Sequence, residues 1–278
     1  MKRLLVAVAF ATVLSYGVFA QKLIVRMDDT GGAHSMNAAI MKCFEDGIGT
    51  DTEILAVGPW FLEAARLCNE HPGLDVGIHL AITSEWQQYK WRPITHCPSL
   101  CDEDGYLKAS LSFGDNSSYD LAEVESELRA QIELALKYVK NVSHLSDHMM
   151  FTFVPGLGDI VKKLSKEYGL RYQGGPDDSA IGLESLGMIM RKDGKPRSEM
   201  LLEAIKQMEP GKTYWTIEHP AFDDAEMSGM FTRPGGNVGA DRQDVTDAFM
   251  SPEIMKYIKE KGIELTTFAD FYKTAGVR

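Results

Sequence analysis

Short apolar segments alternate with amphipathic ones from Lys22 to the end of the 278-residue chain, and this alternation limits the fold more than any other feature. Strands that alternate with helices over such a length predict parallel strands joined by crossover helices, hence an α/β barrel or a doubly wound sheet. The glycine-rich phosphate loop of dinucleotide-binding sheets does not follow the first apolar segment, residues 23–27. We therefore expect a single α/β domain that is not of the dinucleotide-binding type.

The expected strands and helices follow one another without an internal repeat. Asp120 and Glu123 form a capping-box pattern at the start of the longest expected helix. The pattern predicts strands at residues 23–27, 53–57, 74–80, 142–149, 188–190, 213–217 and 263–267, and helices at 36–44, 59–69, 121–139, 157–168, 199–208 and 251–261.

The first 20 residues have the composition of a secretory signal peptide. A basic start is followed by a short apolar run and by small residues at Val18 and Ala20, so we expect cleavage before Gln21. The apolar run is shorter than the roughly 20 residues of a membrane anchor. We therefore expect residues 21–278 to be exported, to the periplasm or the extracellular space, without a membrane anchor.

Export would place the four cysteines in an oxidising compartment. Cys97 and Cys101 could close a local loop and leave Cys43 to pair with Cys68, although four cysteines allow three pairings. A structural zinc site would need CxxC-type pairs, which the sequence lacks. The sequence leaves open whether the four cysteines form disulfides or stay as buried thiols.

The acidic character of the chain argues against two classes of partner. The formal net charge is −11 at pH 7, and no run of lysine or arginine offsets it. Such a surface repels phosphate backbones and anionic membranes, so we expect no nucleic-acid partner. The sequence leaves open whether the chain is a monomer or a homodimer.

One predicted connection is much longer than the others. Roughly 38 residues separate the third strand from the helix that begins after Asp120, where such connections usually have about 2–6 residues. Sugar faces stack on tryptophan and tyrosine, so this segment is a candidate substrate loop, although its aromatic side chains can equally be core packing. The residues concerned are Trp86, Tyr89, Trp91 and Arg92, followed by Tyr106 and Phe113.

Acidic and histidine side chains fall at the carboxyl ends of several predicted strands, which meet at one mouth in a barrel or open α/β sheet. Two imidazoles and one carboxylate form a three-ligand site with open positions, as a catalytic metal requires. At the turn after the first strand, one aspartate could bind the metal while its neighbour takes a proton from water. The residues are Asp28, Asp29, His79, His144, His148 and His219, with Asp147 as a candidate for orienting the His148 ring.

The ordered set of these motifs resembles the YdjC-like carbohydrate deacetylases, the chitooligosaccharide deacetylase family. The resemblance lies in residues 23–31, Asn37–Ile40, Val76–Leu80, Ser143–His148, Glu218–Pro220 and Arg242, and so extends over the whole exported chain. It implies a distorted, incomplete (β/α) TIM-like barrel and hydrolysis of an N-acetyl group on an amino sugar.

Carried over by position, the resemblance implies Asp29, His79 and His148 as ligands of one divalent metal ion, Mg²⁺ or Zn²⁺. It implies Asp28 as the general base and His219 as the acid for the departing amine. His144 and Asp147 are candidates for contacts behind the ligands.

The chain departs from the family pattern at several positions beside these residues. Ser146 stands where the family usually has aspartate, and Met149 and Met150 lie where a further histidine is found. Arg26 and Thr30 replace the usual asparagine and aromatic neighbours of the aspartate pair.

Three other functions would use the same residues. A non-catalytic glycan-binding protein could keep the barrel, but it would not require Asp28 and His219. A metal hydrolase of esters or of another amide would use the same site. An iron oxygenase also accepts two histidines and a carboxylate, but it offers no role for Asp28 or His219.

Overall fold

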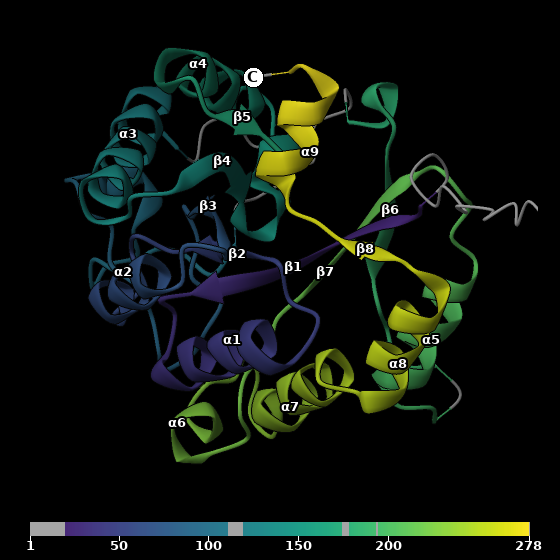
Figure 1. Ribbon diagram of the computed structural model, residues 1–278. Coiled ribbons are helices and arrows are strands. Elements are labelled where there is room, and N and C mark those ends of the chain that lie inside the picture. Colours follow the sequence, from purple (N-terminus) through teal and green to yellow (C-terminus); the bar gives the residue numbers. More distant parts are fainter. Residues whose placement is uncertain (1–19, 111–118, 174–177, 193, 278) are drawn as a thin grey trace, which may run out of the picture.

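Seven parallel strands form one curved sheet at the centre of the molecule, in the order β5-β4-β3-β2-β1-β7-β6 (Figure 1). The structure is a computed structural model that describes residues 20–110, 119–173, 178–192 and 194–277. A short eighth strand, β8, pairs with the start of β1. The strands are β1 Lys22–Thr30, β2 Asp51–Ile54, β3 Asp75–Leu80, β4 Val142–Asp147, β5 Arg171–Tyr172, β6 Leu183–Met188, β7 Thr213–Glu218 and β8 Glu264–Leu265.

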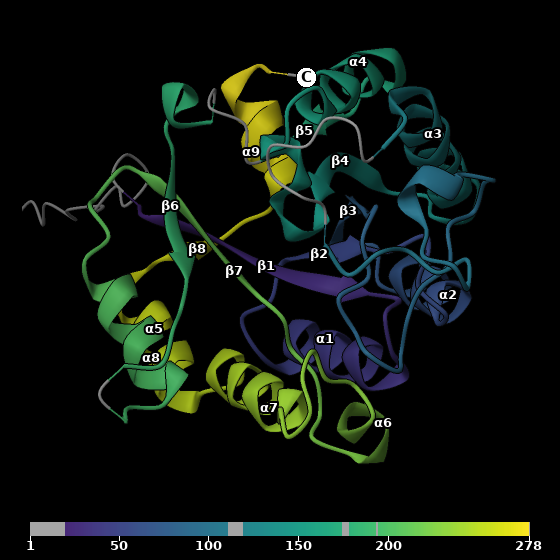
Figure 2. The same cartoon turned by 180° about the vertical axis from the view of Figure 1, so that it is seen from behind.

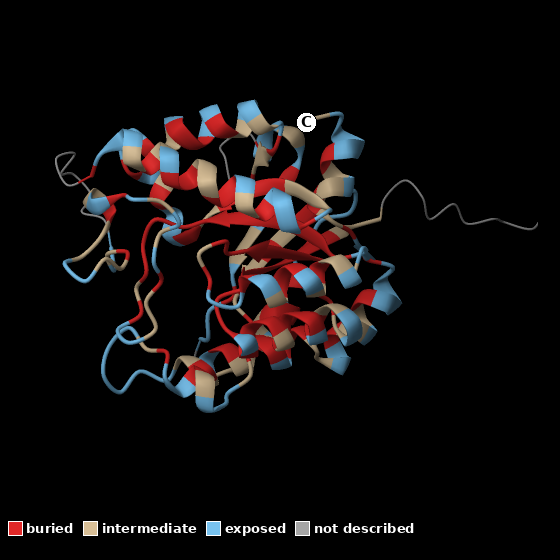
Figure 3. Ribbon diagram, turned by 90° about the vertical axis from the view of Figure 1, so that its left-hand side faces the viewer, coloured by how far each residue is buried: buried red, intermediate tan, exposed pale blue. Residues whose placement is uncertain are grey.

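Helices surround the outer face of this sheet, as the two opposite views in Figures 1 and 2 show. Figure 3 shows the buried strands between helices whose outward faces are exposed, which is the layering expected of crossover connections. The helices are α1 His34–Asp46, α2 Phe61–Glu70, α3 Leu121–Tyr138, α4 Leu157–Tyr168, α5 Arg197–Lys206, α6 Ala225–Ser228, α7 Val238–Phe249, α8 Pro252–Lys261 and α9 Phe268–Ala275, with short 3₁₀ helices η1 Pro98–Leu100, η2 His148–Phe153 and η3 Ser179–Ile181.

The sheet curls into an incomplete barrel, because its edge strands β5 and β6 do not pair with each other within the described residues. At the amino ends of the strands the interior is apolar, where Phe268 and Tyr272 of α9 pack with Ile24 and Leu183. The predicted α/β fold, an incomplete TIM-like barrel, is therefore confirmed. Since Ile24, Arg26 and Asp28 alternate on one face of β1, the interior becomes polar toward the carboxyl ends.

Several element boundaries differ from the sequence prediction. β2 covers Asp51–Ile54 instead of residues 53–57, and β6 covers Leu183–Met188 instead of 188–190. The predicted last strand, residues 263–267, shortens to β8, and α9 follows it where no helix was predicted. β5 and α6 were not predicted, because two and four residues are too few to show a hydrophobic period. α7 was not predicted either, because its buried face includes the polar residues Arg242 and Thr246 and its apolar period is therefore weak.

The cysteine and terminal predictions have different outcomes. All four cysteines carry free thiols, and burial raises the pKa of Cys43, Cys68 and Cys97 to about 12. Neither proposed disulfide is therefore formed.

The signal-peptide prediction concerns residues 1–20, of which 1–19 lie outside the described residues, as does Phe113. None of the helices in the described ranges is long and apolar enough to cross a membrane.

Candidate metal centre

Three predicted ligands, Asp29, His79 and His148, meet at the carboxyl ends of the strands. All three are buried, and one donor atom of each lies within 4.8 Å of the others. Asp29 Oδ1 is 3.7 Å from His79 Nε2 and 3.5 Å from His148 Nδ1. Asp29 lies near the end of β1, His79 lies in β3, and His148 follows β4 directly.

The backbone of β1 explains how two consecutive aspartates can face one site. Consecutive side chains of a regular strand point to opposite faces. Asp29 instead has a φ of 73°, in the left-handed region, and the register of β1 against β2 shifts between Met27 and Thr30. Such strained positions gather at functional sites. This local distortion brings the Asp29 carboxylate to the same mouth as Asp28.

The two oxygens of Asp29 have different surroundings. Oδ2 accepts a hydrogen bond from Arg242 Nη2 at 2.7 Å, whereas Oδ1 is buried and has no hydrogen-bond partner. Burial opposes ionisation, but Arg242 and His148 hold the pKa of Asp29 well below its usual range. An ionised, unpaired oxygen between two imidazoles fits a bound cation.

Each of the two histidines has a partner at its other ring nitrogen. His148 Nε2 lies 2.9 Å from Glu85, and His79 Nδ1 lies 2.9 Å from the Ser146 hydroxyl. Although burial opposes protonation, Glu85 and Asp29 raise the pKa of His148 to about 10. Burial and the charges of His148 and Arg26 keep the pKa of His79 well below its usual value. A positive charge is therefore stabilised at His148 beside Asp29, whereas the His79 imidazole is neutral.

Asp28, the predicted base, is held by Arg26. Arg26 Nε donates to Asp28 Oδ1 at 2.6 Å, and Nη2 donates to Oδ2 at 2.8 Å. Asp28 Oδ2 also lies 3.5 Å from His79 Nε2, beside the ligand set. Burial raises the pKa of Asp28 to about 7, against the opposing effect of Arg26. A carboxylate with such a pKa can accept and release a proton near neutrality.

His219, the predicted acid, follows β7 and is partly exposed. Removal from water lowers the pKa of His219 to about 4, and Asp29, Arg242 and His148 are near enough for their charges to act on it. His219 therefore belongs to the same mouth and is neutral at neutral pH. As a neutral imidazole it can accept a proton, but it must be protonated before it can donate one.

His144 and Asp147 do not lie directly behind the ligands as expected. His144 points into the barrel from within β4, and its Nε2 lies 2.7 Å from Glu53. Asp147 accepts hydrogen bonds from Thr152 Oγ1 and Tyr172 Oη, both at 2.8 Å, and Glu85 takes the place beside His148 that was predicted for Asp147. Asp147 does not reach the His148 ring because successive side chains along a strand point to opposite faces, so the two residues project in different directions.

The candidate substrate loop lies over the metal centre, but its tryptophans are not open faces. Trp91 lies 5.2 Å from the His148 ring, and Trp86 lies 5.4 Å from the Arg242 guanidinium, measured to ring centroids, and both are buried. Tyr89 is half-buried, with its hydroxyl 3.3 Å from Glu226, and Arg92 stacks at 4.2 Å on Tyr106. The two tryptophans thus support residues of the site, whereas Tyr89 and Arg92 are less buried than the tryptophans.

Helix α3 anchors this loop. Glu127 accepts hydrogen bonds from Ile94 N at 3.0 Å and Thr95 N at 2.8 Å. The predicted cap is formed, since Asp120 accepts from Ala122 N. Glu123 does not complete the capping box, because it binds Ser99 N instead.

Two residues of the site were missed by sequence reasoning. Glu85 lies in a loop with no periodic pattern, so no signal in one sequence marks it. Glu53 could have been noticed, because Asp51, Thr52 and Glu53 are consecutive polar residues in a strand, and all are buried. A buried run of this kind indicates a polar interior.

Comparisons with known proteins identify the family and the fold. A sequence model of the YdjC-like protein family matches residues 22–260. Proteins named carbohydrate deacetylase from Geobacillus stearothermophilus and Listeria monocytogenes are each 26% identical to this chain over 255 residues. These matches cover 90% of this chain and 98% and 99% of the two relatives. A solved structure from Enterococcus faecalis, named for cellobiose-phosphate cleavage, is similar with a TM-score of 0.73 and 23% identity, over 90% of this chain and 98% of that one. At that identity the structural match supports the fold alone.

Proposed function

Because this chain belongs to the YdjC-like protein family, we propose that it is a divalent-metal-dependent hydrolase that removes N-acetyl groups from an amino sugar or oligosaccharide. The proposal depends above all on one observation, the buried and unpaired Oδ1 of Asp29 between His79 and His148. The carbohydrate class of the substrate comes from the names of the relatives.

The donor set fits one divalent ion. Two imidazole nitrogens and one carboxylate oxygen suit Zn²⁺ better than Mg²⁺, which prefers oxygen ligands. When bound, such an ion supplies Lewis-acid polarisation of a carbonyl and lowers the pKa of water. His79 would offer Nε2 and His148 would offer Nδ1, because Ser146 and Glu85 occupy the other nitrogens.

Asp28 would remove the proton from the attacking water. Its pKa of about 7 suits a base near neutrality, and Arg26 fixes the orientation of the carboxylate through both oxygens. Each carboxylate oxygen keeps a further lone pair for the water, despite the bond to Arg26.

His219 would protonate the departing amine after it has itself gained a proton. An imidazolium with a pKa of about 4 is a strong acid, so a protonated His219 would readily donate to an amine. The proton comes from the water that Asp28 deprotonates. Because the pKa of Asp28 (about 7) is above that of His219 (about 4), this transfer is driven by the amine, whose basicity rises as the C–N bond breaks. The reaction then needs no further proton from bulk solvent before acetate leaves.

Acetate release from a panel of N-acetylated and O-acetylated saccharides tests this function. The chain is loaded in turn with Zn²⁺, Mg²⁺, Mn²⁺ and Co²⁺, and Asp28→Asn is the matched control. We expect metal-dependent acetate from an N-acetyl sugar, and a loss of about 10²–10⁴-fold in turnover with unchanged bound metal in Asp28→Asn.

Three other outcomes would change either the proposed function or the proposed base. Acetate from O-acetylated substrates alone would favour an esterase. One equivalent of bound metal without acetate from any substrate would favour a glycan-binding protein. Full activity of Asp28→Asn would remove Asp28 from the role of base.

We further propose that the chain is exported and that its mature form begins at Gln21. Mass spectrometry of the secreted or periplasmic protein tests this cleavage, because retention of residues 1–20 would contradict it.

A further inference from the structure

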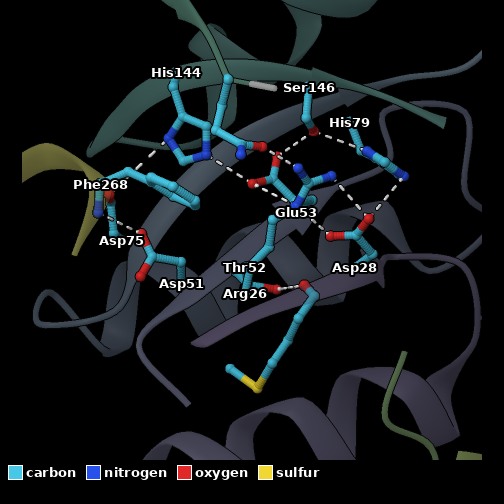
Figure 4. A network of polar contacts seen from close by, with 12 residues as sticks. Arg26, Asp28, Asp51, Thr52, Glu53, Asp75, His79, His144, Ser146 and Phe268 are labelled. Carbon is cyan, nitrogen blue, oxygen red and sulfur yellow. Dashed lines mark hydrogen bonds and ion pairs between the residues drawn. The ribbon is translucent and has the colours of Figure 1, made fainter. Parts of the chain in front are cut away.

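A carboxylate on β2 reaches across β3 to β4 in the interior of the barrel. Glu53 of β2 is opposite Gly77 of β3, and Gly77 is in turn opposite His144 of β4. A side chain at Gly77 would collide with both the Glu53 carboxylate and the His144 ring. Because Gly77 has none, Glu53 Oε1 comes within 2.7 Å of His144 Nε2, as Figure 4 shows.

The other oxygen of Glu53 leads to a predicted metal ligand. The Ser146 hydroxyl donates a hydrogen bond to Glu53 Oε2, and the same hydroxyl lies 2.9 Å from His79 Nδ1. Ser146 and His79 are opposite each other in the β3–β4 register, and all three side chains are almost completely buried. Glu53, Ser146 and His79 therefore form one continuous chain of hydrogen bonds (Figure 4).

The direction of each hydrogen bond in this chain follows from the charge of Glu53. Although burial opposes ionisation, His144 and Arg26 lower the pKa of Glu53 to about 2, so its oxygens can only accept. The hydroxyl hydrogen of Ser146 is therefore used toward Glu53, and His79 Nδ1 must donate to the Ser146 oxygen. His79 Nε2 then carries the free lone pair, and it is the nitrogen that faces Asp29 Oδ1.

We propose that Glu53 is a positioning residue for the metal centre, which fixes the orientation and tautomer of His79 through the Ser146 hydroxyl. The proposal rests on the metal site that the proposed function requires. Partners behind a ligating histidine commonly fix its tautomer and raise its basicity. Here the carboxylate acts through a hydroxyl, because the uncharged Ser146 contacts His79 directly and Glu53 lies behind it.

Glu53 also supports the base side of the site. Its Oε1 lies 3.4 Å from Arg26 Nε, and Arg26 holds both oxygens of Asp28. One buried carboxylate thus links the ligand His79 with the predicted base Asp28.

Metal affinity of the full chain tests the proposal without any substrate. Co²⁺ and Zn²⁺ dissociation constants are measured by competition with a chelating dye, and the Co²⁺ absorption spectrum reports the ligand geometry. We expect Ser146→Ala and Glu53→Gln each to weaken binding by about 10–100-fold and to change the Co²⁺ spectrum. The double variant should bind about as weakly as Glu53→Gln alone, because both changes interrupt the same chain of hydrogen bonds.

Ser165→Ala is the matched control. Ser165 donates a hydrogen bond to Leu170 O at 2.6 Å at the end of α4, outside the site, so this variant loses a hydroxyl of the same kind. Its metal affinity should equal that of the unaltered chain. Circular dichroism establishes that each variant is folded, and if Glu53→Gln does not fold, Ser146→Ala decides the question.

Two results would overturn the proposal. Unchanged metal affinity in Ser146→Ala would remove the hydroxyl from the metal centre, and additive losses in the double variant would show that Glu53 and Ser146 act separately. A chain that binds neither Co²⁺ nor Zn²⁺ before any substitution would instead overturn the metal centre, and with it the proposed function.

Discussion

Two pairs of buried aspartates lie at opposite ends of the same sheet, and their hydrogen bonding differs. At the amino ends of β2 and β3, every carboxylate oxygen of Asp51 and Asp75 accepts a hydrogen bond. Two of the donors are the first backbone N–H groups of α9, those of Phe268 at 2.9 Å and Ala269 at 2.8 Å. At the carboxyl end of β1, Arg26 and Arg242 satisfy three oxygens of Asp28 and Asp29, and Asp29 Oδ1 has no donor.

The difference separates a structural role from a binding role. A buried polar atom without a hydrogen bond is costly, so native proteins keep few of them without a reason. The Asp51–Asp75 pair attaches the C-terminal helix to the bottom of the barrel and leaves no oxygen free. The Asp28–Asp29 pair keeps one oxygen free beside two imidazoles, and this oxygen is the one that a cation would satisfy.

The largest expected effect is the loss of metal binding in Asp29→Asn. An amide oxygen is a weaker, uncharged ligand, so we expect the Zn²⁺ affinity to fall by more than about 100-fold, beyond the effect of a partner behind a ligand. The matched variant is Asp51→Asn, which changes an equally buried aspartate in the same sheet. Its Zn²⁺ affinity should not change. Both affinities can be measured by isothermal titration calorimetry.

A folding control is needed because Asp29→Asn also removes the charged partner of Arg242. Breaking such a buried pair costs about 3–5 kcal/mol, so chemical unfolding of both variants should accompany the titrations. Equal Zn²⁺ affinity in folded Asp29→Asn and in the unaltered chain would contradict the distinction between the two aspartate pairs.

A smaller effect is expected from Glu85→Gln. Glu85 lies 2.9 Å from His148 Nε2, so its charge favours donation of that N–H and leaves Nδ1 for the metal. We expect a loss of about 10–100-fold in Zn²⁺ affinity. Asp147→Asn is the control, because Asp147 binds Thr152 and Tyr172 instead of His148. An equal loss in both variants would assign the effect to general disturbance of the surroundings of His148.

The architecture was predictable from the sequence because it depends on repeated local patterns. Alternating apolar segments identified β1, β3, β4 and β7 and the helices α1 to α5 and α8, but not α7. β5, with two residues, and α6, with four, are held by neighbouring elements and not by a pattern of their own. α9 was missed although the sequence marks it locally, since Thr267 caps its amino end and Gly276 follows its last residue.

The sequence predicted only those residues of the candidate site that lie at the ends of strands. Asp28, Asp29, His79 and His148 follow from their positions at those ends, and the structure brings them together. The partners behind them depend on contacts between distant segments. Glu85 reaches His148 from a loop, and no rule of spacing predicts such a contact.

The smallest expected effect concerns the structural pair and the pH dependence of stability. Burial and the neighbouring Asp75 raise the pKa of Asp51 well above its usual value. In the unfolded chain Asp51 loses its proton near pH 4, whereas in the folded chain it keeps the proton to higher pH. Its contribution to the free energy of unfolding is therefore complete below about pH 4 and is lost as the pH rises toward the folded-state pKa.

Asp51→Asn should remove this dependence. Like the protonated carboxyl, its amide is uncharged beside Asp75, but it has no proton to lose. The free energy of unfolding of Asp51→Asn, relative to the unaltered chain, should therefore rise between pH 4.5 and pH 8, by at most about 1.4 kcal/mol per pH unit. Urea unfolding in the presence of EDTA measures it, with the exposed Asp104→Asn as control. If Asp51→Asn and Asp104→Asn have the same pH dependence, Asp51 does not keep its proton above its usual pKa. The contrast between the Asp51–Asp75 pair and the Asp28–Asp29 pair then depends on hydrogen bonding alone.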